Sequence, residues 1–436
     1  MTSTLLTSPS ASRLNTPTLH RLSNGLTIVA EQIPVEAVNL SIWLNVGSAI
    51  EPDAINGMAH FLEHMVFKGT EKLQSGEFER LIEKRGAITN AATSQDYTHY
   101  YITTAPKDFA ELVPLQLDVV MNASINDEAF DRERNVVLEE IRRAEDNPRR
   151  RTFQRAVETA FSRLPYRRPV LGSTQVIEHL KPQQMRDFHA AWYRPQSMTA
   201  VAVGNLPVEE LIGIIEAGVK SVQRPEPVLL DTRSLLANFP SFSPEPAFET
   251  IERQEFVDET LQQARLVMAW RVPGLVDLQQ TYELDVLASI LGQGRTARLI
   301  RDLREDRRLV SNISASNVNY GIQGAFYISA QLPVENLAEV EAAITDHLRF
   351  LQALPVTEAE IGRVRTQVAN RFIFGNETPS DRAGLYGYHQ AILGDLAPAL
   401  DYPGHIQALD TTDLQRAAQQ YLSPDAYGVV VLKPKA

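Results

Sequence analysis

Two histidines and a glutamate in the segment AHFLEHMVFKGT have the residue types and the spacing of a hydrolytic metal site. His60 and His64 are four residues apart, so on a helix both imidazoles point to the same side. Two neutral imidazole nitrogens arranged in this way can bind one zinc ion at about 2.0–2.1 Å. Glu63 lies beside the same face, where its carboxylate can take a proton from a zinc-bound water and later pass it to a leaving amine. The order His-x-x-Glu-His is the inverted form of a common zinc-helix motif.

The alternative for this segment is an amphipathic helix whose histidines and glutamate are simply solvated. Neighbouring apolar residues such as Phe61 and Met65 would form a core face in either case, so they do not discriminate. With nine histidines in the chain, the five-residue pattern arises by chance in about one such chain in a hundred. The spacing therefore favours the metal site.

Zinc in a catalytic site has three protein ligands and a water, so a third ligand is needed. The acidic candidates lie in ERNVVLEEIRRAED, which is typical of a helix with Val136, Val137 and Ile141 on a buried stripe. Glu133 and Glu140 are seven residues apart, two turns along one face, and one can bind the metal while the other supports a ligand. The periodicity does not choose between Glu140 and Glu139, and without the histidine pair a charged surface helix is the better interpretation.

The surrounding sequence predicts the elements that position these residues. Asn24-Gly25 lies between two apolar runs, which is a hairpin signal. Apolar residues alternate from Val38 to Val46, which predicts a half-buried strand, and THYYITTA predicts another. GAITNAATSQ is typical of a polar turn that leads into that strand. Helices are expected at 56–68, 76–85, 107–145 and 150–162.

Composition excludes several classes of protein. The 436 residues carry 42 basic and 54 acidic side chains, a net charge of −12 that disfavours nucleic-acid binding. Cysteine is absent, so disulfides, thiolate zinc sites and iron–sulfur clusters are excluded. No run of 18 apolar residues exists, and no membrane span is expected. We expect a soluble cytoplasmic protein, with an organelle or the periplasm as alternatives.

The chain divides near its middle. Residues 1–17 are expected to be a disordered leader, and residues 223–247, which are rich in proline, a linker. QQMRDFHAAWYRPQSMTAVAVG at Gln183 resembles TDLQRAAQQYLSPDAYGVVVLK at Thr412 in register, which indicates an internal duplication. We therefore predict two α+β domains, at 18–222 and 248–436, each with a mixed or antiparallel sheet.

The motifs together resemble the pitrilysin family of zinc metallopeptidases, which includes insulysin and the mitochondrial processing peptidases. The resemblance covers nearly the whole chain. It rests on LNVGSAIEP, GMAHFLEHMVFKGT, GAITNAATSQDYTHYY, VVLEEIRR, LPYRRPVLGS and WYRPQSMTAVAVGN in the first half, and on ILGQGRTARLIRDLRE in the second.

The resemblance implies a role for each site residue. His60, His64 and Glu140 match the zinc ligands, Glu63 matches the general base, and Glu133 matches a supporting acid. The segment Asn90, Ala91, Ala92 and Thr93 resembles an edge strand that pairs with an extended peptide, a mode of binding that tolerates many sequences.

The resemblance also implies an architecture. Two homologous α/β-roll domains would form half of a clamshell, and a homodimer or a heterodimer with a sister subunit would close a chamber around peptides or unfolded segments. The second half has no His-x-x-Glu-His, and its comparable helix reads TYELDVLASILG. Each chain would therefore hold one zinc ion, and the second half would be an inactive copy.

Family members place an Arg and a Tyr from the inactive half near the metal, where they stabilise the oxyanion. Arg382 and Tyr388 in NETPSDRAGLYGYHQ are the candidates. The alternative is a helix start, with Thr378 or Ser380 as the cap, Arg382 on the surface and the tyrosines in the core. The isolated histidines His99, His189 and His389 are more typical of packed or surface residues than of ligands.

These observations predict a zinc-dependent endopeptidase. The alternative is a subunit of a heterodimeric processing peptidase that is either non-proteolytic or active only with its partner.

Overall fold

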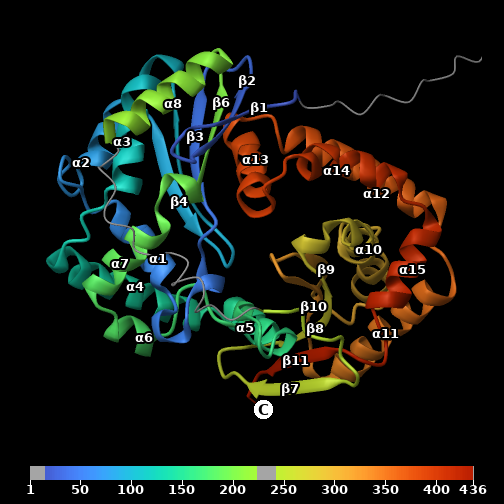
Figure 1. The fold of residues 1–436 in the computed structure, drawn as a ribbon. Helices are drawn as coiled ribbons and strands as arrows, with labels where there is room; N and C mark the ends of the chain where they lie inside the picture. Colours follow the sequence, from blue (N-terminus) through green and yellow to red (C-terminus); the bar gives the residue numbers. More distant parts are fainter. Residues whose placement is uncertain (1–14, 223–241, 436) are drawn as a thin grey trace, which may run out of the picture.

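The computed structural model describes residues 15–222 and 242–435, which form two β-sheets with helices around them (Figure 1). Most of the predicted leader and of the predicted linker lies outside these residues. Within them, no helix is both long enough and apolar enough to cross a membrane.

The first sheet has six strands in the order β1-β2-β6-β3-β5-β4. Only β2 and β6 pair in parallel; the other neighbours are antiparallel. The predicted hairpin joins β1 to β2, and Gly25 has the positive φ (+91°) that such a turn requires. The strands are β1 (Thr18–Arg21), β2 (Thr27–Gln32), β3 (Val38–Leu44), β4 (Ile88–Thr93), β5 (Thr98–Thr104) and β6 (Met198–Gly204).

The second sheet repeats the topology of the first without a counterpart of β1. Its order is β7-β11-β8-β10-β9, and again only one pair, β7 with β11, is parallel. β7 thus corresponds to β2, β11 to β6, β8 to β3, β10 to β5 and β9 to β4, which supports a duplication. The strands are β7 (Glu252–Val257), β8 (Ala264–Pro273), β9 (Asn312–Val318), β10 (Gln323–Leu332) and β11 (Gly428–Lys433).

Each sheet has a helical layer from its own half. One face of the first sheet is covered by α1 (Met58–Val66), α2 (Glu77–Lys84), α3 (Pro106–Met121), α4 (Asp127–Asp146), α6 (Thr174–His179), α7 (Pro182–Trp192) and α8 (Val208–Val222). The corresponding layer of the second sheet is α10 (Tyr282–Gly292), α11 (Leu337–Ala353), α12 (Glu358–Phe374), α14 (Ala397–Ala408) and α15 (Thr411–Tyr421). The helices predicted in the first half are confirmed.

The two halves exchange one helix each across their boundary. α5 (Pro148–Ala160) packs on β8 and β11 of the second sheet, and α13 (Pro379–Leu393) packs on β3 and β6 of the first. Figure 1 shows both helices on the faces of the sheets that lie toward the opposite half. This exchange corrects one expectation: β3 is buried on both faces rather than half-buried, because α13 covers Trp43 on the second face.

A second correction concerns GAITNAATSQ. Ile88–Thr93 is a strand, β4, rather than a polar turn, and it is the edge of the first sheet beside β5. Its residues alternate between exposed and half-buried, as expected of a strand with one face on the core.

A buried carboxylate fixes the segment that enters the second half. Glu245, 4% exposed, accepts hydrogen bonds from the backbone N–H groups of Ser162, Arg163 and Leu164, and from the Ser162 hydroxyl. Arg271 of β8 lies 3.3 Å from the same carboxylate. Burial alone would raise the pKa of Glu245, but these hydrogen bonds outweigh it and lower the pKa to about 2.

We therefore expect Glu245→Gln to lower the free energy of unfolding at pH 7 by on the order of 2 kcal/mol. Because the folded-state pKa lies below its ordinary value of 4.5, the contribution is fully present above pH 4.5 and is lost as the pH falls toward 2. Urea unfolding at pH 7 and pH 3 measures both effects. Glu249→Gln, an exposed neighbour, is the control, and an equal difference between Glu245→Gln and wild type at both pH values would contradict the assignment.

Candidate metal centre

The helix that carries the histidine pair is held at its N-terminus by a buried carboxylate. Glu51, 2% exposed, accepts hydrogen bonds from the N–H groups of Gly57 and Ala59 (both 2.7 Å) and from the Asn56 side chain (2.9 Å). Burial raises the pKa of Glu51 to about 7, against the opposing effect of these bonds. Gly57 has φ +97°, and a Cβ there would lie 2.6 Å from the Leu171 carbonyl oxygen, so only glycine fits.

Packing fixes α1 against α4. Phe61 of α1 and Phe130 of α4 are fully buried, and their rings stack with centroids 4.5 Å apart. The buried stripe of α4 contains Val137, Leu138 and Ile141. The expectation that Val136 belongs to this stripe is wrong, because its side chain is 50% exposed.

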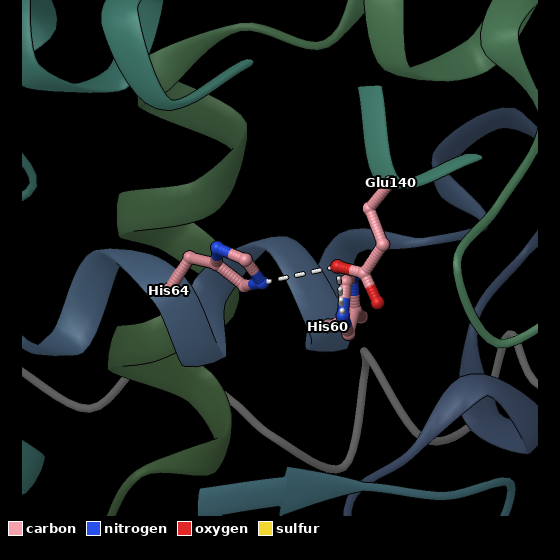
Figure 2. A group of neighbouring side chains, drawn as sticks. All are labelled: His60, His64 and Glu140. Carbon is pink, nitrogen blue, oxygen red and sulfur yellow. Dashed lines mark ion pairs between the residues drawn. The ribbon is translucent and has the colours of Figure 1, made fainter. Parts of the chain in front are cut away.

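This packing brings His60, His64 and Glu140 together (Figure 2). Glu140 reaches from α4 toward both imidazoles, and its Oε2 lies 3.5 Å from His60 Nε2 and 3.6 Å from His64 Nε2. The candidate ligand atoms of the three residues all lie within 4.8 Å of one another. Glu139 instead pairs with Arg142 and Arg143, so the rotation of α4 selects Glu140.

The donor set fits zinc. Three ligand atoms about 2.0–2.2 Å from one ion, at tetrahedral angles, are separated by roughly 3.4 Å. The two distances to Glu140 are close to that separation and too long for good hydrogen bonds. Two imidazole nitrogens and one carboxylate oxygen are the chemistry of a catalytic zinc site with a free fourth position.

A second carboxylate orients His64. Glu133, two turns before Glu140 on α4, lies 3.0 Å from His64 Nδ1, and Lys68 lies 2.8 Å from the other Glu133 oxygen. A carboxylate on Nδ1 leaves Nε2 free to bind a metal. Lys68 is not among the residues predicted from the sequence, although its position four residues after His64 would place it near the same face of a helix.

The electrostatic environment differs between the two histidines. Burial, with the charge of His64, lowers the pKa of His60 to about 4. Burial would also lower the pKa of His64, but the carboxylates of Glu133 and Glu140 beside it outweigh burial and raise that pKa to about 9. His60 is therefore neutral and ready to bind a metal, while His64 must release a proton to its carboxylate neighbours or to solvent.

Glu63 lies at the junction of the cluster and the edge strand. Its carboxylate accepts a hydrogen bond from the hydroxyl of Thr93, the last residue of β4. Burial raises the pKa of Glu63 above its ordinary value. The structure thus places Asn90, Ala91, Ala92 and Thr93 on the strand next to the cluster, with the outer edge of β4 unpaired in the described sheet.

Arg382 and Tyr388 do not contact the cluster within the chain. Arg382 binds Glu31 of β2 and the carbonyl oxygen of Asn376, and β6, β3 and β5 lie between β2 and β4. Tyr388 packs edge-on against Tyr97, with ring centroids 5.7 Å apart. Thr378 caps α13 by accepting from the Asp381 N–H, as the structural alternative predicts, but Arg382 is half-buried, with its side chain 17% exposed, rather than on the surface. The catalytic roles of Arg382 and Tyr388 stay a prediction.

The position in the second half that corresponds to the metal cluster carries different residues. α10 packs against β9 as α1 packs against β4. Asp285 of α10 accepts from the side chains of Asn317 (2.9 Å) and Tyr402 (3.1 Å). The cluster of His60, His64 and Glu140 is the one group of its kind in the described part of the chain.

The adjacent glutamates of α4 provide a matched test of the ligand set. We expect Glu140→Gln to lose stoichiometric zinc, because an amide oxygen is a weaker ligand than a carboxylate, while Glu139→Gln keeps it. Metal analysis of the two proteins, purified side by side with circular dichroism as the folding control, measures this. Equal zinc contents would contradict the assignment of Glu140.

Two models of protein families match the chain. The family model described as "Insulinase (Peptidase family M16)" matches residues 27–174, and "Peptidase M16 inactive domain" matches residues 179–368. An uncharacterized zinc protease of Rickettsia bellii is 26% identical over 412 residues, covering 94% of this chain and 96% of its own.

Solved structures share the fold. A protease from Helicobacter pylori has a TM-score of 0.86 at 25% identity, covering 96% of this chain and 99% of its own. The periplasmic protease PqqL from Escherichia coli has a TM-score of 0.79 at 18% identity, and the match covers 97% of this chain but 48% of PqqL. The two family models, in this order along most of the chain, show that the protein belongs to peptidase family M16, the pitrilysin family, in its two-domain form.

Proposed function

We propose that this chain is a zinc-dependent endopeptidase that hydrolyses peptides or unfolded segments. The observation that carries the proposal is the convergence of His60, His64 and Glu140, with Glu63 between this cluster and an open strand edge. Each residue type needed for metal-assisted hydrolysis is present; Glu133 of α4 holds His64, and Thr93 of β4 holds Glu63.

His60, His64 and Glu140 would hold the ion, and Glu133 with Lys68 would keep His64 in the tautomer that binds it. Zinc at this place would polarise the scissile carbonyl and make a water acidic enough to attack near neutral pH. The support from the family is the name zinc protease given to relatives such as the Rickettsia bellii protein.

Glu63 is the proposed general base. Its carboxylate would accept a proton from the attacking water and donate it to the leaving amine. Burial raises its pKa toward the operating pH, which suits a group that must both take and give a proton. The Thr93 hydroxyl would hold the carboxylate in position between these two transfers.

β4 is the proposed binding strand for substrate. Its outer edge offers the backbone groups of residues 88–93 to an extended peptide, which would lie beside Glu63 at the Thr93 end. Main-chain pairing binds many sequences, so the site would act on unfolded segments rather than on folded proteins.

We further propose that two chains assemble around the substrate, as a homodimer or with a sister subunit. The chain matches 48% of PqqL, a protease about twice as long, so two copies would supply a comparable set of domains. In this division residues 18–222 form the catalytic domain, residues 223–247 the linker, and residues 248–436 the inactive domain. Each chain would bind one zinc ion.

Replacement of the base tests the mechanism. We expect Glu63→Gln to keep zinc and its affinity for peptides but to lower kcat by about 10²–10⁴-fold, because proton transfer is lost while the ligands remain. Glu83→Gln, an exposed residue of α2, is the control. Unchanged turnover in Glu63→Gln with full zinc content would falsify the role of Glu63.

An assay of this chain purified on its own tests whether it is active without a partner protein. We expect cleavage of an unstructured peptide mixture that stops with a chelator and returns with added zinc. Light scattering on the same sample gives the oligomeric state, for which we expect a dimer. A zinc-loaded chain without hydrolysis, which recovers activity only with a sister protein, would support the partner-dependent alternative instead.

A further inference from the structure

The two halves of the chain contact each other through the turns of equivalent hairpins. The turn between β4 and β5 (residues 94–97) meets the turn between β9 and β10 (residues 319–322). The Asp96 carboxylate lies between these turns and accepts a hydrogen bond of 2.9 Å from the Gly321 N–H. The contact thus joins two places that are 225 residues apart in the sequence.

Tyr166 completes this contact from η3 (Pro165–Arg167) in the first half. Its hydroxyl donates to the Asp96 carboxylate (3.2 Å) and accepts from the Ile322 N–H (2.8 Å). The Tyr166 ring stacks on Tyr320, with centroids 4.5 Å apart. Both groups that donate to Asp96 are neutral, so the carboxylate serves here as a hydrogen-bond acceptor rather than as one side of an ion pair. We call Asp96, Tyr166, Gly321 and Ile322 the turn–turn contact.

The turn–turn contact is closely packed. A Cβ on Gly321 would lie 3.1 Å from Asp96 Oδ1 and 3.4 Å from the Tyr166 hydroxyl oxygen. The first of these distances is shorter than ordinary van der Waals contact, so even a methyl group would displace the carboxylate by a few tenths of an ångström. The position of the β4–β5 turn is therefore set in part by the second half of the chain.

The β4–β5 turn adjoins the residue that holds the proposed base. Thr93 is the last residue of β4, three positions before Asp96, and its hydroxyl donates to the Glu63 carboxylate. The turn is closed by a hydrogen bond of 2.8 Å from the Ser94 N–H to the Tyr97 carbonyl oxygen, so its residues shift together. A displacement of Asp96 would therefore move the Thr93 hydroxyl relative to Glu63.

The first half also holds this turn, through backbone groups. Two N–H groups of η1 (Ser48–Ile50) donate to the carbonyl oxygens of Ser94 (3.2 Å) and Gln95 (2.8 Å). η1 in turn packs on η3, the element that carries Tyr166. Because η1 rests on the element whose tyrosine holds Asp96, the backbone contacts and the turn–turn contact are not independent of each other.

The binding strand itself is held without the turn–turn contact. β4 pairs with β5 along its whole length, from Ile88 opposite Thr103 to Thr93 opposite Thr98. Loss of the turn–turn contact would leave this ladder in place, and with it the backbone groups that β4 offers to a peptide. The Thr93 hydroxyl, at the end of the ladder beside the turn, is the group that would move.

We propose that Asp96 is a positioning residue through which the second half of the chain holds the Thr93 hydroxyl on Glu63. Gly321 and Tyr166 supply the hydrogen bonds that fix Asp96. The inference rests on the proposed function and extends it, since the half that lacks His-x-x-Glu-His gains a part in the reaction of the other half. It acts through hydrogen bonds within one chain and sends no group of its own to the metal.

Kinetics of two variants, one in each half, test this role. We expect Asp96→Ala to lower kcat by about 10-fold or more with KM within about 3-fold, because a small misplacement of a catalytic group is costly while the binding strand is kept. Gly321→Ala should lower kcat in the same way, by about 3-fold or more. Asp96→Asn, which keeps an acceptor oxygen, should restore most of kcat. Asp401→Ala, at an exposed position of α14, is the control, and zinc content and circular dichroism are measured on every sample.

A double-mutant cycle shows whether Asp96 acts through Thr93. Thr93→Val removes the hydroxyl with little change in shape, and its kcat should fall at least as far as that of Asp96→Ala. Adding Asp96→Ala to Thr93→Val should then change kcat by less than about 2-fold, because the interaction that Asp96 supports is already absent. A combined loss equal to the product of the two single losses overturns the positioning role, and so does an unchanged kcat in Asp96→Ala.

Hydrogen exchange separates this proposal from the proposed function, because it needs no turnover. We expect residues 94–98 to exchange about 3-fold faster or more in Gly321→Ala than in wild type, while β6 exchanges as before. Unchanged exchange overturns the hold of the second half on this turn even where hydrolysis is confirmed. Faster exchange in Gly321→Ala, together with a zinc-loaded wild type that cleaves no peptide, supports that hold and contradicts the proposed function instead.

Discussion

The contact between α1 and α4 is the constraint on which the site depends. A pair of histidines on one helix can be specified by local spacing, but the third donor must come from another element at a fixed distance. The stack of Phe61 on Phe130 supplies that distance, and the Glu51 carboxylate holds the start of α1 against it. Apolar packing and one buried carboxylate thus determine where three polar side chains meet.

The rotation of α4 illustrates how packing selects chemistry. Val137, Leu138 and Ile141 face the core, so Glu140 turns toward the histidines while Glu139 pairs with arginines in solvent. Two identical side chains, one residue apart, acquire different environments because one helix has one buried side. The same rotation places Glu133 behind His64.

The sequence was informative where interactions are local and less so where they are distant. The His60–His64 spacing, the hairpin at Gly25 and the helices of the first half follow from near neighbours, and the structure agrees. The choice between Glu139 and Glu140 required the orientation of a helix. Val136 was wrongly assigned to the core, because hydrophobicity alone does not distinguish an exposed valine from a buried one. Arg382 is bound by Glu31, 351 residues away, and no pattern within its own segment reveals that contact. The packing of α13 on the second face of β3 could not be predicted either, because α13 belongs to the other half of the chain.

The exchange of α5 and α13 has a consequence for how such a chain can evolve. Each sheet borrows one layer from the other copy, so neither copy retains a complete core when it is separated from the other. At the position in the second half that corresponds to the metal cluster, Asp285 accepts hydrogen bonds from Asn317 and Tyr402 and so is satisfied without an ion. The second half could not be discarded, because the surviving copy would expose the face that α13 covers. The second half is therefore needed to complete the core of the first, independently of any contribution to the site.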